Sequence, residues 1–224
     1  RILRLINERV SVYDDPAGPI VPFPVFRNVQ GSRYIHVRPD EKEDYILKAY
    51  HQLIKSATSE ILIANAYFLP SPEIIKDLHA AAKRGVDIKI LSNHASSHKL
   101  NMINLVGRSY YFDLKQKFPD KIQIFEWTGK RPNDRSLSHN TMHSKYMVID
   151  QKVSLVGSHN LDYSSQNNSE TAIIFESDVL SEELADYYNK LKSYSIEPLM
   201  DTLYYYKYPK GKDLILLKIL NNER

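Results

Sequence analysis

Residues 143–160 read HSKYMVIDQKVSLVGSHN, and this stretch decides how the rest of the chain is interpreted. It contains two short apolar runs, YMVI and VSLV, with a polar break between them and a glycine after the second. Two β-prone runs joined by a short polar link predict a β-hairpin. Because side chains alternate between the faces of a strand, we expect His143 and Lys145 on the same face.

The register of this hairpin depends on its turn. With a two-residue turn at 151–152, Asp150 pairs with Val153. Counting back along the strands then brings four polar side chains onto one patch, with Lys145 opposite Ser158 and His143 opposite Asn160. Asp150 is an odd number of residues from Lys145, so its side chain points to the other face of the strand. We therefore expect it to bond backbone groups at the turn.

The predicted patch has the chemistry of a phosphodiester site. Lys145 supplies a fixed positive charge for a phosphate oxygen, and Ser158 and Asn160 add neutral donors. His143 is the nucleophile or general acid/base that works near neutral pH. Spacing alone leaves an equally open alternative, a surface hairpin that carries an unrelated histidine and lysine.

The order and spacing of these residues resemble the HKD motif of the phospholipase D superfamily. The matching positions are His143-x-Lys145-x4-Asp150, Gly157-Ser158-x-Asn160 and Glu170. In that family one histidine attacks phosphorus and forms a phosphohistidine. A histidine from a second copy of the motif protonates the leaving alcohol. The resemblance implies that neither a metal nor any other cofactor takes part.

The resemblance also implies roles for individual residues. The catalytic set is His143, Lys145, Asp150 and Glu170, and the phosphate-binding set is Lys145, Ser158 and Asn160. A carboxylate at Glu170 is expected to hydrogen-bond the catalytic histidine, and His143, in a second motif, is assigned the general-acid role. Two departures stand out: Ser164 replaces an arginine that is common in the family, and the gap from Asn160 to Glu170 is one residue shorter.

Other segments are similar to the cardiolipin synthase branch of the same superfamily. They are YFLP at 67–70, AAKRGVDI at 81–88, LSNHASS at 91–97 and IFEW at 124–127. With the motif, the resemblance covers about residues 60–176. It places the chain in the second, C-terminal half of a two-motif protein.

Hydrophobic periodicity predicts an alternation of helices and strands. Helices are expected at 41–56, 72–84 (with Ser71 as N-cap), 97–117 and 181–194 (with Ser181 as N-cap). Strands are expected at 60–66, 86–91, 124–127 and 171–176, besides the hairpin. A strand–helix–strand unit with short turns implies a parallel pair. The predicted fold class is α/β, a mixed central β-sheet flanked by helices on both faces, as in the phospholipase D-like αβα sandwich.

The chain divides into three predicted parts. Residues 1–32 are rich in proline breaks and read as a connector from a preceding half. Residues 33–200 form the domain with one HKD motif, and residues 201–224 form an aromatic and basic tail. The chain starts with Arg1, so we expect a processed or trimmed piece. The second motif is expected from an upstream half of the polypeptide or from another subunit.

Composition narrows the function classes. The 224 residues are 42% hydrophobic and 25% charged, which is typical of a folded domain. A net charge of +3 is too small to indicate nucleic-acid binding by itself. The absence of cysteine excludes disulfides, thiolate zinc sites and a thiol nucleophile. His94 and His98 have a spacing seen in metal sites but no cluster of carboxylates nearby in the sequence. His159 is expected to be a bystander that faces away from the patch.

The favoured function is a phospholipase D-type phosphatidyltransferase that acts on phosphatidylglycerol or phosphatidylethanolamine. It is expected to contact the bacterial cell membrane peripherally, or otherwise to be cytoplasmic. One alternative is a homodimeric phosphodiesterase or nuclease of the same superfamily, for which nucleic acid is the substrate. The other is a non-catalytic half that scaffolds its partner. The tail, with interleaved Tyr and Lys, suits a membrane interface, stacking on bases or packing on a neighbouring domain.

Overall fold

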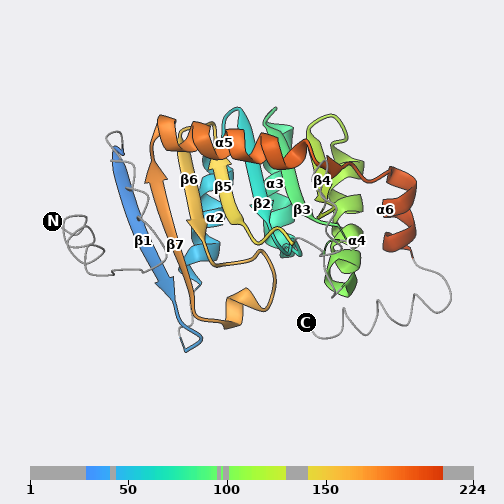
Figure 1. Cartoon of the computed structure of the whole chain (residues 1–224), viewed down its shortest axis with the longest axis horizontal. Helices are drawn as coiled ribbons and strands as arrows, with labels where there is room; N and C mark the ends of the chain where they lie inside the picture. The colour runs from blue at the N-terminus through green and yellow to red at the C-terminus, as the bar shows by residue number, and fades with distance from the viewer. Residues whose placement is uncertain (1–28, 41–43, 95–96, 98–100, 130–140, 209–224) are drawn as a thin grey trace, which may run out of the picture.

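The computed structural model of the protein describes residues 29–40, 44–94, 97, 101–129 and 141–208 (Figure 1). The described residues form one eight-stranded sheet with the order β1-β7-β6-β5-β2-β3-β4-β8. Its strands are β1 (Gly31–Val37), β2 (Glu60–Asn65), β3 (Asp87–Asn93), β4 (Ile122–Trp127), β5 (Lys145–Ile149), β6 (Val153–Gly157), β7 (Glu170–Glu176) and β8 (Ser195–Ile196). The helices are α2 (Tyr45–Ser56), α3 (Pro72–Lys83), α4 (Asn101–Lys117), α5 (Asp178–Lys192) and α6 (Met200–Lys207), with a 3₁₀ turn η2 (Ser165–Asn167).

The sheet is mixed, as predicted. Strands β2, β3 and β4 are parallel neighbours, and every other pair in the described sheet is antiparallel. Helix α5 crosses one face of the sheet, while α2, α3 and α4 cover the other (Figure 1). The predicted α/β sandwich with helices on both faces is therefore confirmed.

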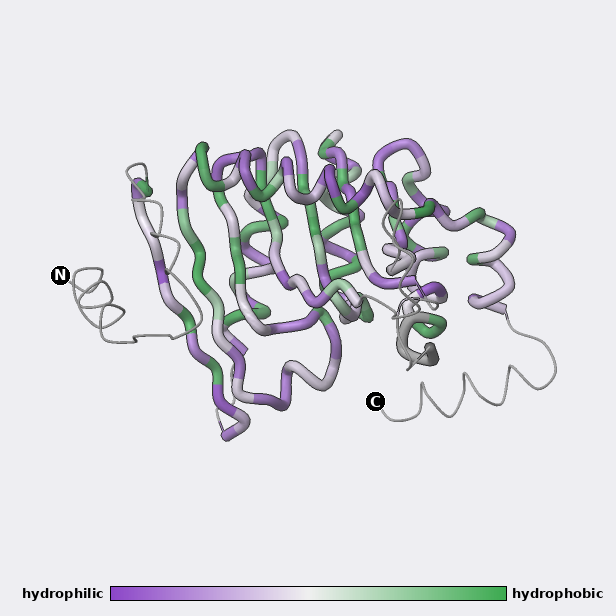
Figure 2. The backbone as a smooth tube through the Cα atoms, in the orientation of Figure 1, coloured by the Kyte–Doolittle hydropathy of each residue, from purple (hydrophilic) through white to green (hydrophobic). Residues whose placement is uncertain are grey.

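Alternation along the central strands divides the core into two layers. In β2, Ile61 and Ile63 belong to the cluster under α2, α3 and α4. Their neighbours Leu62 and Ala64 belong to the cluster under α5. Both faces of the central strands are buried, so the middle residues of these strands are apolar and the polar residues lie at their ends (Figure 2).

The β5–β6 hairpin is confirmed, but its predicted register is wrong by one residue. Ile149, not Asp150, pairs with Val153. Asp150 and Gln151 both take positive φ, and the backbone N–H of Lys152 donates to the carbonyl of Ile149 at 2.9 Å. The turn is thus centred on 150–151 rather than on 151–152. Counted in this register, the pairs of Lys145 with Ser158 and of His143 with Asn160 do not form.

The start of α5 also differs from the prediction. The N-cap is Ser177, whose hydroxyl accepts the Leu180 N–H at 3.3 Å. Ser181 lies one turn further on and is fully buried, and its hydroxyl is 2.8 Å from that of Ser154 on β6. Ser181 therefore joins the helix to the sheet instead of capping the helix.

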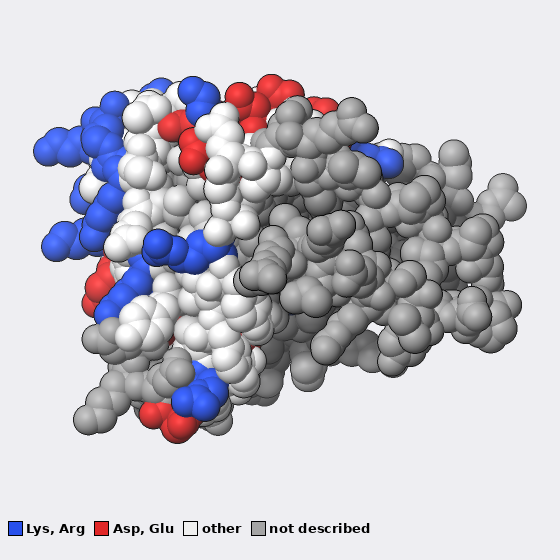
Figure 3. Space-filling view, turned by 90° about the vertical axis from the view of Figure 1, so that its left-hand side faces the viewer, with Lys and Arg blue, Asp and Glu red and all other residues white. Residues whose placement is uncertain are grey.

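Two elements at the ends of the described chain were not predicted. Strand β1 pairs with β7 and includes Gly31 and Ser32 of the predicted connector. Figure 3 looks toward this side of the molecule, where Lys and Arg gather along the left margin and both signs of charge also occur elsewhere on the face. Helix α6 forms from the start of the predicted tail, and its Leu203 is fully buried in the core. Residues 1–28 and 209–224 of the predicted connector and tail lie outside the described residues.

Candidate active site

The predicted site lies at one end of the sheet. Strands β2, β3 and β6 end there, and β5 and β7 begin there, because β5 runs antiparallel to both of its neighbours (Figure 1). The sequence motif enters at the start of β5 and continues beyond the end of β6. Polar groups at this edge can converge without disturbing the apolar core.

His143 lies just before β5, and its neighbours on both sides are held. The Asn93 side chain, fully buried at the end of β3, accepts the Met142 N–H at 3.0 Å and donates to the Met142 carbonyl at 2.8 Å. On the other side, the Ala66 N–H donates to the Ser144 carbonyl at 2.9 Å. The imidazole of His143 is exposed on a backbone that is fixed from both sides.

Lys145 is the first residue of β5 and is only 7% exposed. Its Nζ donates to the carbonyl of His143 at 2.9 Å. Burial lowers the pKa of Lys145 below its ordinary value, although the negative charges of Glu170 and Asp162 oppose the shift. The charges of these two carboxylates therefore partly offset the cost of burying the ammonium.

Ser158 and Glu170 form the second part of the cluster. The Ser158 hydroxyl donates to the Glu170 carboxylate and accepts the Thr171 N–H at 3.0 Å. Glu170 is buried, with 8% exposure, at the start of β7. The structure thus joins two predicted site residues directly. The predicted contact between Glu170 and His143 stays a prediction.

The loop after β6 fixes Asn160 by its backbone. The Asn160 N–H donates to the hydroxyl of Ser165 at 2.9 Å, and the Ser165 N–H donates to Asp162 Oδ1 at 2.8 Å. Sequence reasoning missed the roles of Ser165 and Asp162. The only local signal was the polar, turn-prone composition of the segment.

Asp150 lies away from this cluster, at the other end of β5. Its carboxylate accepts five hydrogen bonds, from the N–H and hydroxyl of Thr58, the N–H and hydroxyl of Ser59, and the N–H of Glu60. Burial by itself raises the pKa of Asp150, but the bonds from Glu60, Thr58 and Ser59 outweigh it and hold the pKa far below its usual range. Asp150 therefore ties the turn to the start of β2. It bonds backbone groups, as expected, but these belong to residues 58–60 and not to the turn itself.

His159 faces away from the cluster, as predicted. Its ring is 1% exposed and its Nε2 is 2.9 Å from the carboxylate of Asp44, just before α2. His94 lies 3.8 Å from Glu126, whose carboxylate is bound by both Arg108 Nε and Nη2. Among the described residues no group of three or more His, Asp or Glu is arranged to hold a metal ion. His98 lies outside the described residues.

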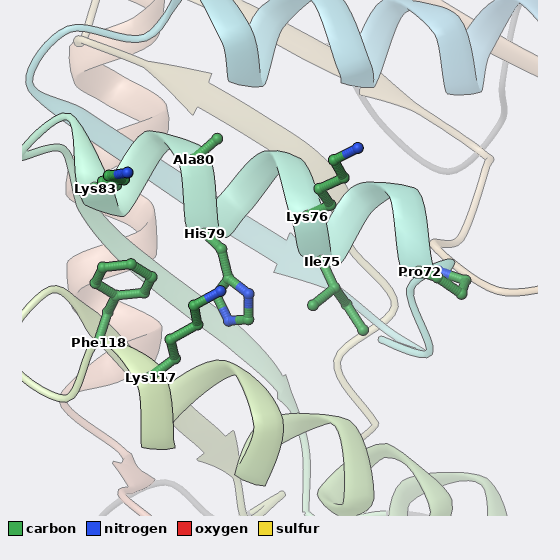
Figure 4. Close-up of a pocket in the computed structure, with 8 residues that line it drawn as sticks. All are labelled: Pro72, Ile75, Lys76, His79, Ala80, Lys83, Lys117 and Phe118. Atoms are coloured by element: carbon green, nitrogen blue, oxygen red, sulfur yellow. The ribbon is translucent and has the colours of Figure 1, made fainter.

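A groove between α3 and α4 has a volume of about 570 Å³ (Figure 4). Its lining combines apolar side chains with basic ones: Pro72, Ile75, Lys76, His79, Ala80, Lys83, Lys117 and Phe118. None of the motif residues lines it. The groove is therefore separate from the cluster at the strand ends.

Comparisons with known proteins identify the family to which the fold belongs. Residues 50–192 match the family model described as "Cardiolipin synthase, PLD-like domain". The chain is 29% identical over 167 residues to a cardiolipin synthase from Geobacillus sp. (strain WCH70), covering 74% of this chain and 30% of that protein. It is 27% identical over 164 residues to one from Clostridium perfringens (strain SM101 / Type A), covering 73% and 31%. The chain thus spans about a third of the length of these curated relatives.

Solved structures share the fold. A phospholipase D family member, Nuc from Salmonella typhimurium, has a TM-score of 0.57 at 20% identity, with 75% of this chain and 99% of that chain covered. NucT from Helicobacter pylori has a TM-score of 0.60 at 21% identity, with 75% and 100% covered. Phosphatidylserine synthase from Haemophilus influenzae Rd KW20 has a TM-score of 0.61 at 12% identity, with 85% and 44% covered. With the family model matching well over half of its length, the chain belongs to the cardiolipin synthase family of phospholipase D-like domains.

Proposed function

We propose that this chain forms one half of a phosphatidyltransferase site that makes cardiolipin or a closely related lipid. The substrate is phosphatidylglycerol or phosphatidylethanolamine, and the second HKD motif comes from an upstream half or from another subunit. His143 is the general acid of this half. Lys145, Ser158 and Asn160 hold the non-bridging phosphoryl oxygens, and Glu170 orients the donors around them.

The proposed reaction has two steps. The histidine of the other half attacks phosphorus, so a P–N bond forms as the P–O bond to the head-group alcohol breaks. His143 gives its proton to the departing oxygen, which leaves as glycerol or a related alcohol. In the second step His143 takes the proton from the hydroxyl of the acceptor lipid. That oxygen attacks the phosphohistidine, and the free histidine is regenerated.

The observation that carries this proposal is the buried group of charges at the strand ends. Lys145 is only 7% exposed, and burying an ammonium group costs free energy unless its charge is compensated. Lys145 sits near Glu170 and Asp162, and Glu170 in turn holds the Ser158 hydroxyl. A preorganised cation with an oriented hydroxyl beside it suits the equatorial oxygens of a phosphoryl group in the transition state.

A second candidate is a homodimeric phosphodiesterase or nuclease in which each chain supplies one motif. The likeness in fold to Nuc and NucT favours it, because a single copy of the fold accounts for 99% and 100% of those chains. The family model and the curated relatives favour the lipid transferase instead.

The two candidates separate in one assay. The complete gene product and the 224-residue chain are each incubated in EDTA with phosphatidylglycerol vesicles and, separately, with DNA. The proposal predicts cardiolipin from the complete product. If the second motif comes from an upstream half, the 224-residue chain alone makes none, and if it comes from another copy of the chain, the chain alone makes cardiolipin as well. Cleavage of DNA by the shorter chain alone, without lipid transfer, would overturn the proposal in favour of the homodimer.

We also propose that the enzyme works at the bacterial cell membrane through peripheral contact. Within the described residues, no helix is both long enough and apolar enough to cross a bilayer. The support for membrane contact is therefore the lipid nature of the proposed substrate. Flotation of the complete product with phosphatidylglycerol vesicles tests it, and a protein that stays unbound at low salt would contradict it.

A further inference from the structure

The segment that carries Ser158 and Asn160 is fixed residue by residue. The Ser158 N–H donates to the Thr171 carbonyl at 2.9 Å. The Asn160 N–H donates to Ser165, and the Leu161 N–H donates to the Asn65 side chain at 3.2 Å. Between these backbone contacts, His159 is held by its side chain.

The ring of His159 is enclosed by helix α2. It is 1% exposed, its Nε2 lies 2.9 Å from Asp44 Oδ2, and its centroid is 6.1 Å from that of Tyr50. Tyr50 is itself fully buried. A buried imidazole needs a polar partner, and Asp44 is that partner. Asp44 lies on the side of the segment away from the predicted phosphate donors.

The two oxygens of the Asp44 carboxylate bind different partners. Its Oδ1 accepts the Leu47 N–H at 2.8 Å and so caps α2, while its Oδ2 meets His159. Burial alone raises the pKa of Asp44, but the bonds to His159 and Leu47 outweigh it and lower the pKa. The charged carboxylate thereby connects the N-terminus of α2 to His159, which lies between the predicted phosphate ligands Ser158 and Asn160.

We propose that Asp44 and His159 are positioning residues, which set the place of Ser158 and Asn160 relative to Lys145. Neither touches the reacting atoms. They act through the backbone at His159, which connects Ser158 to Asn160. A misplacement of about 1 Å in an active site can lower the rate by about a hundredfold. The inference rests on the proposed function, because it assigns these donors to the phosphoryl group.

The substitution Asp44→Asn isolates this role. Asparagine caps a helix as well as aspartate does, so α2 keeps its start while His159 loses its charged partner. His159→Phe keeps an aromatic ring at this position and removes the hydrogen bond to Asp44. For phosphatidyl transfer by the complete protein we expect each variant to lose about ten- to a hundredfold in kcat, with KM changed by less than about twofold. The double variant should be no worse than either single one, because the pair acts as a unit.

Ser177→Ala is the matched control. It removes the N-cap of α5, and we expect it to lower the thermal midpoint while kcat is unchanged. If Asp44→Asn keeps the wild-type kcat and only the midpoint falls, or if the losses of the single variants add in the double variant, the pair is structural only and the inference is wrong.

A second substrate separates this inference from the lipid assignment. All variants are assayed in parallel on bis(4-nitrophenyl) phosphate, a soluble phosphodiester. If the wild type hydrolyses this diester but makes no cardiolipin, the proposed function fails, and the same comparison of kcat values on the diester still decides the positioning role. A wild type that acts on neither substrate would overturn both.

Discussion

At the scale of single residues, Asp150 shows how a motif position can serve the fold instead of the reaction. Its carboxylate holds residues 58–60 at the start of β2, at the opposite end of β5 from Lys145. Removing it leaves five donors without their acceptor, and hydrogen bonds to charged groups are worth about 1.5–3 kcal/mol each at most. Because these donors are partly exposed to water, the net effect is smaller than the sum.

For Asp150→Asn we expect the free energy of unfolding to fall by about 2–3 kcal/mol at neutral pH. The folded pKa of Asp150 lies below its ordinary value of 3.8, so its contribution is present above that pH and is lost as pH falls towards the folded pKa. Urea unfolding at pH 7 and in acid should therefore show the difference from wild type shrinking on acidification.

Asp87→Asn provides the control for that series. Asp87 forms an exposed ion pair with Lys121 at 2.9 Å, and such pairs contribute about 0–1 kcal/mol. An Asp150→Asn effect that is as small as the control, or that does not change with pH, would contradict the structural role of this carboxylate.

The motif residues could be predicted from the sequence, while their supports could not. The spacing of His143, Lys145 and Ser158 lies within one short stretch of sequence, so the resemblance to a known motif identifies it, although spacing alone left the alternative of an unrelated surface hairpin open. Asn93 hydrogen-bonds to Met142, which is 49 positions away in the sequence, and Asp44 contacts His159 at a separation of 115 positions. Only the tertiary fold brings such pairs together.

At the scale of elements, the contact between β6 and β7 depends on Gly157. A Cβ at this position would lie 2.2 Å from the Thr171 carbonyl oxygen and 2.9 Å from Ala172 Cα. Both are backbone atoms, which cannot move aside as a side chain would. The glycine next to Ser158 is therefore a packing requirement of the strand pair that carries Glu170.

Gly157→Ala should separate β6 from β7 and lower the free energy of unfolding by about 1–3 kcal/mol, as overpacked sites do. Gly31→Ala is the control, because the same Cβ there meets nothing within 4 Å. Chemical denaturation of both variants decides the matter. An alanine at 157 that is as harmless as one at 31 would show that the two strands are not as close as described.

Errors in the predicted elements arose where local signals compete. The sequence analysis placed the cap of α5 at Ser181, but Ser181 is buried against Ser154 and the helix starts one turn earlier, with Ser177 as its cap. The hairpin turn was misplaced because Asp150 and Gln151 both adopt positive φ, which is common for glycine, less so for asparagine and aspartate, and rare for glutamine. A one-residue change in such a turn shifts every pair in the hairpin.

At the scale of the whole molecule, the sandwich was predictable because its centre is strongly patterned. Strands β2 and β5 have apolar runs at their centres, β3 carries Ile88, Ile90 and Leu91, and α3 has clear signals at its start. Strands β1 and β8 and helix α6 were missed, since their sequences are polar, short or aromatic. Their places in the fold follow from partners elsewhere in the chain, such as β7 for β1 and α4 for α6.

The central claim is that this end of the sheet transfers phosphatidyl groups, with His143 as an acid/base group. The most direct measurement is the initial rate of cardiolipin formation by the complete gene product in EDTA, with phosphatidylglycerol vesicles, for wild type and His143→Ala. Circular dichroism confirms folding, and His51→Ala, which removes a histidine paired with Asp77 on the helical face, is the matched control.

The account predicts that His143→Ala lowers the rate by about 10²- to 10⁴-fold, the usual contribution of a general acid or base, while the folded spectrum and the control stay near wild type. An unchanged rate in folded His143→Ala protein would contradict the account.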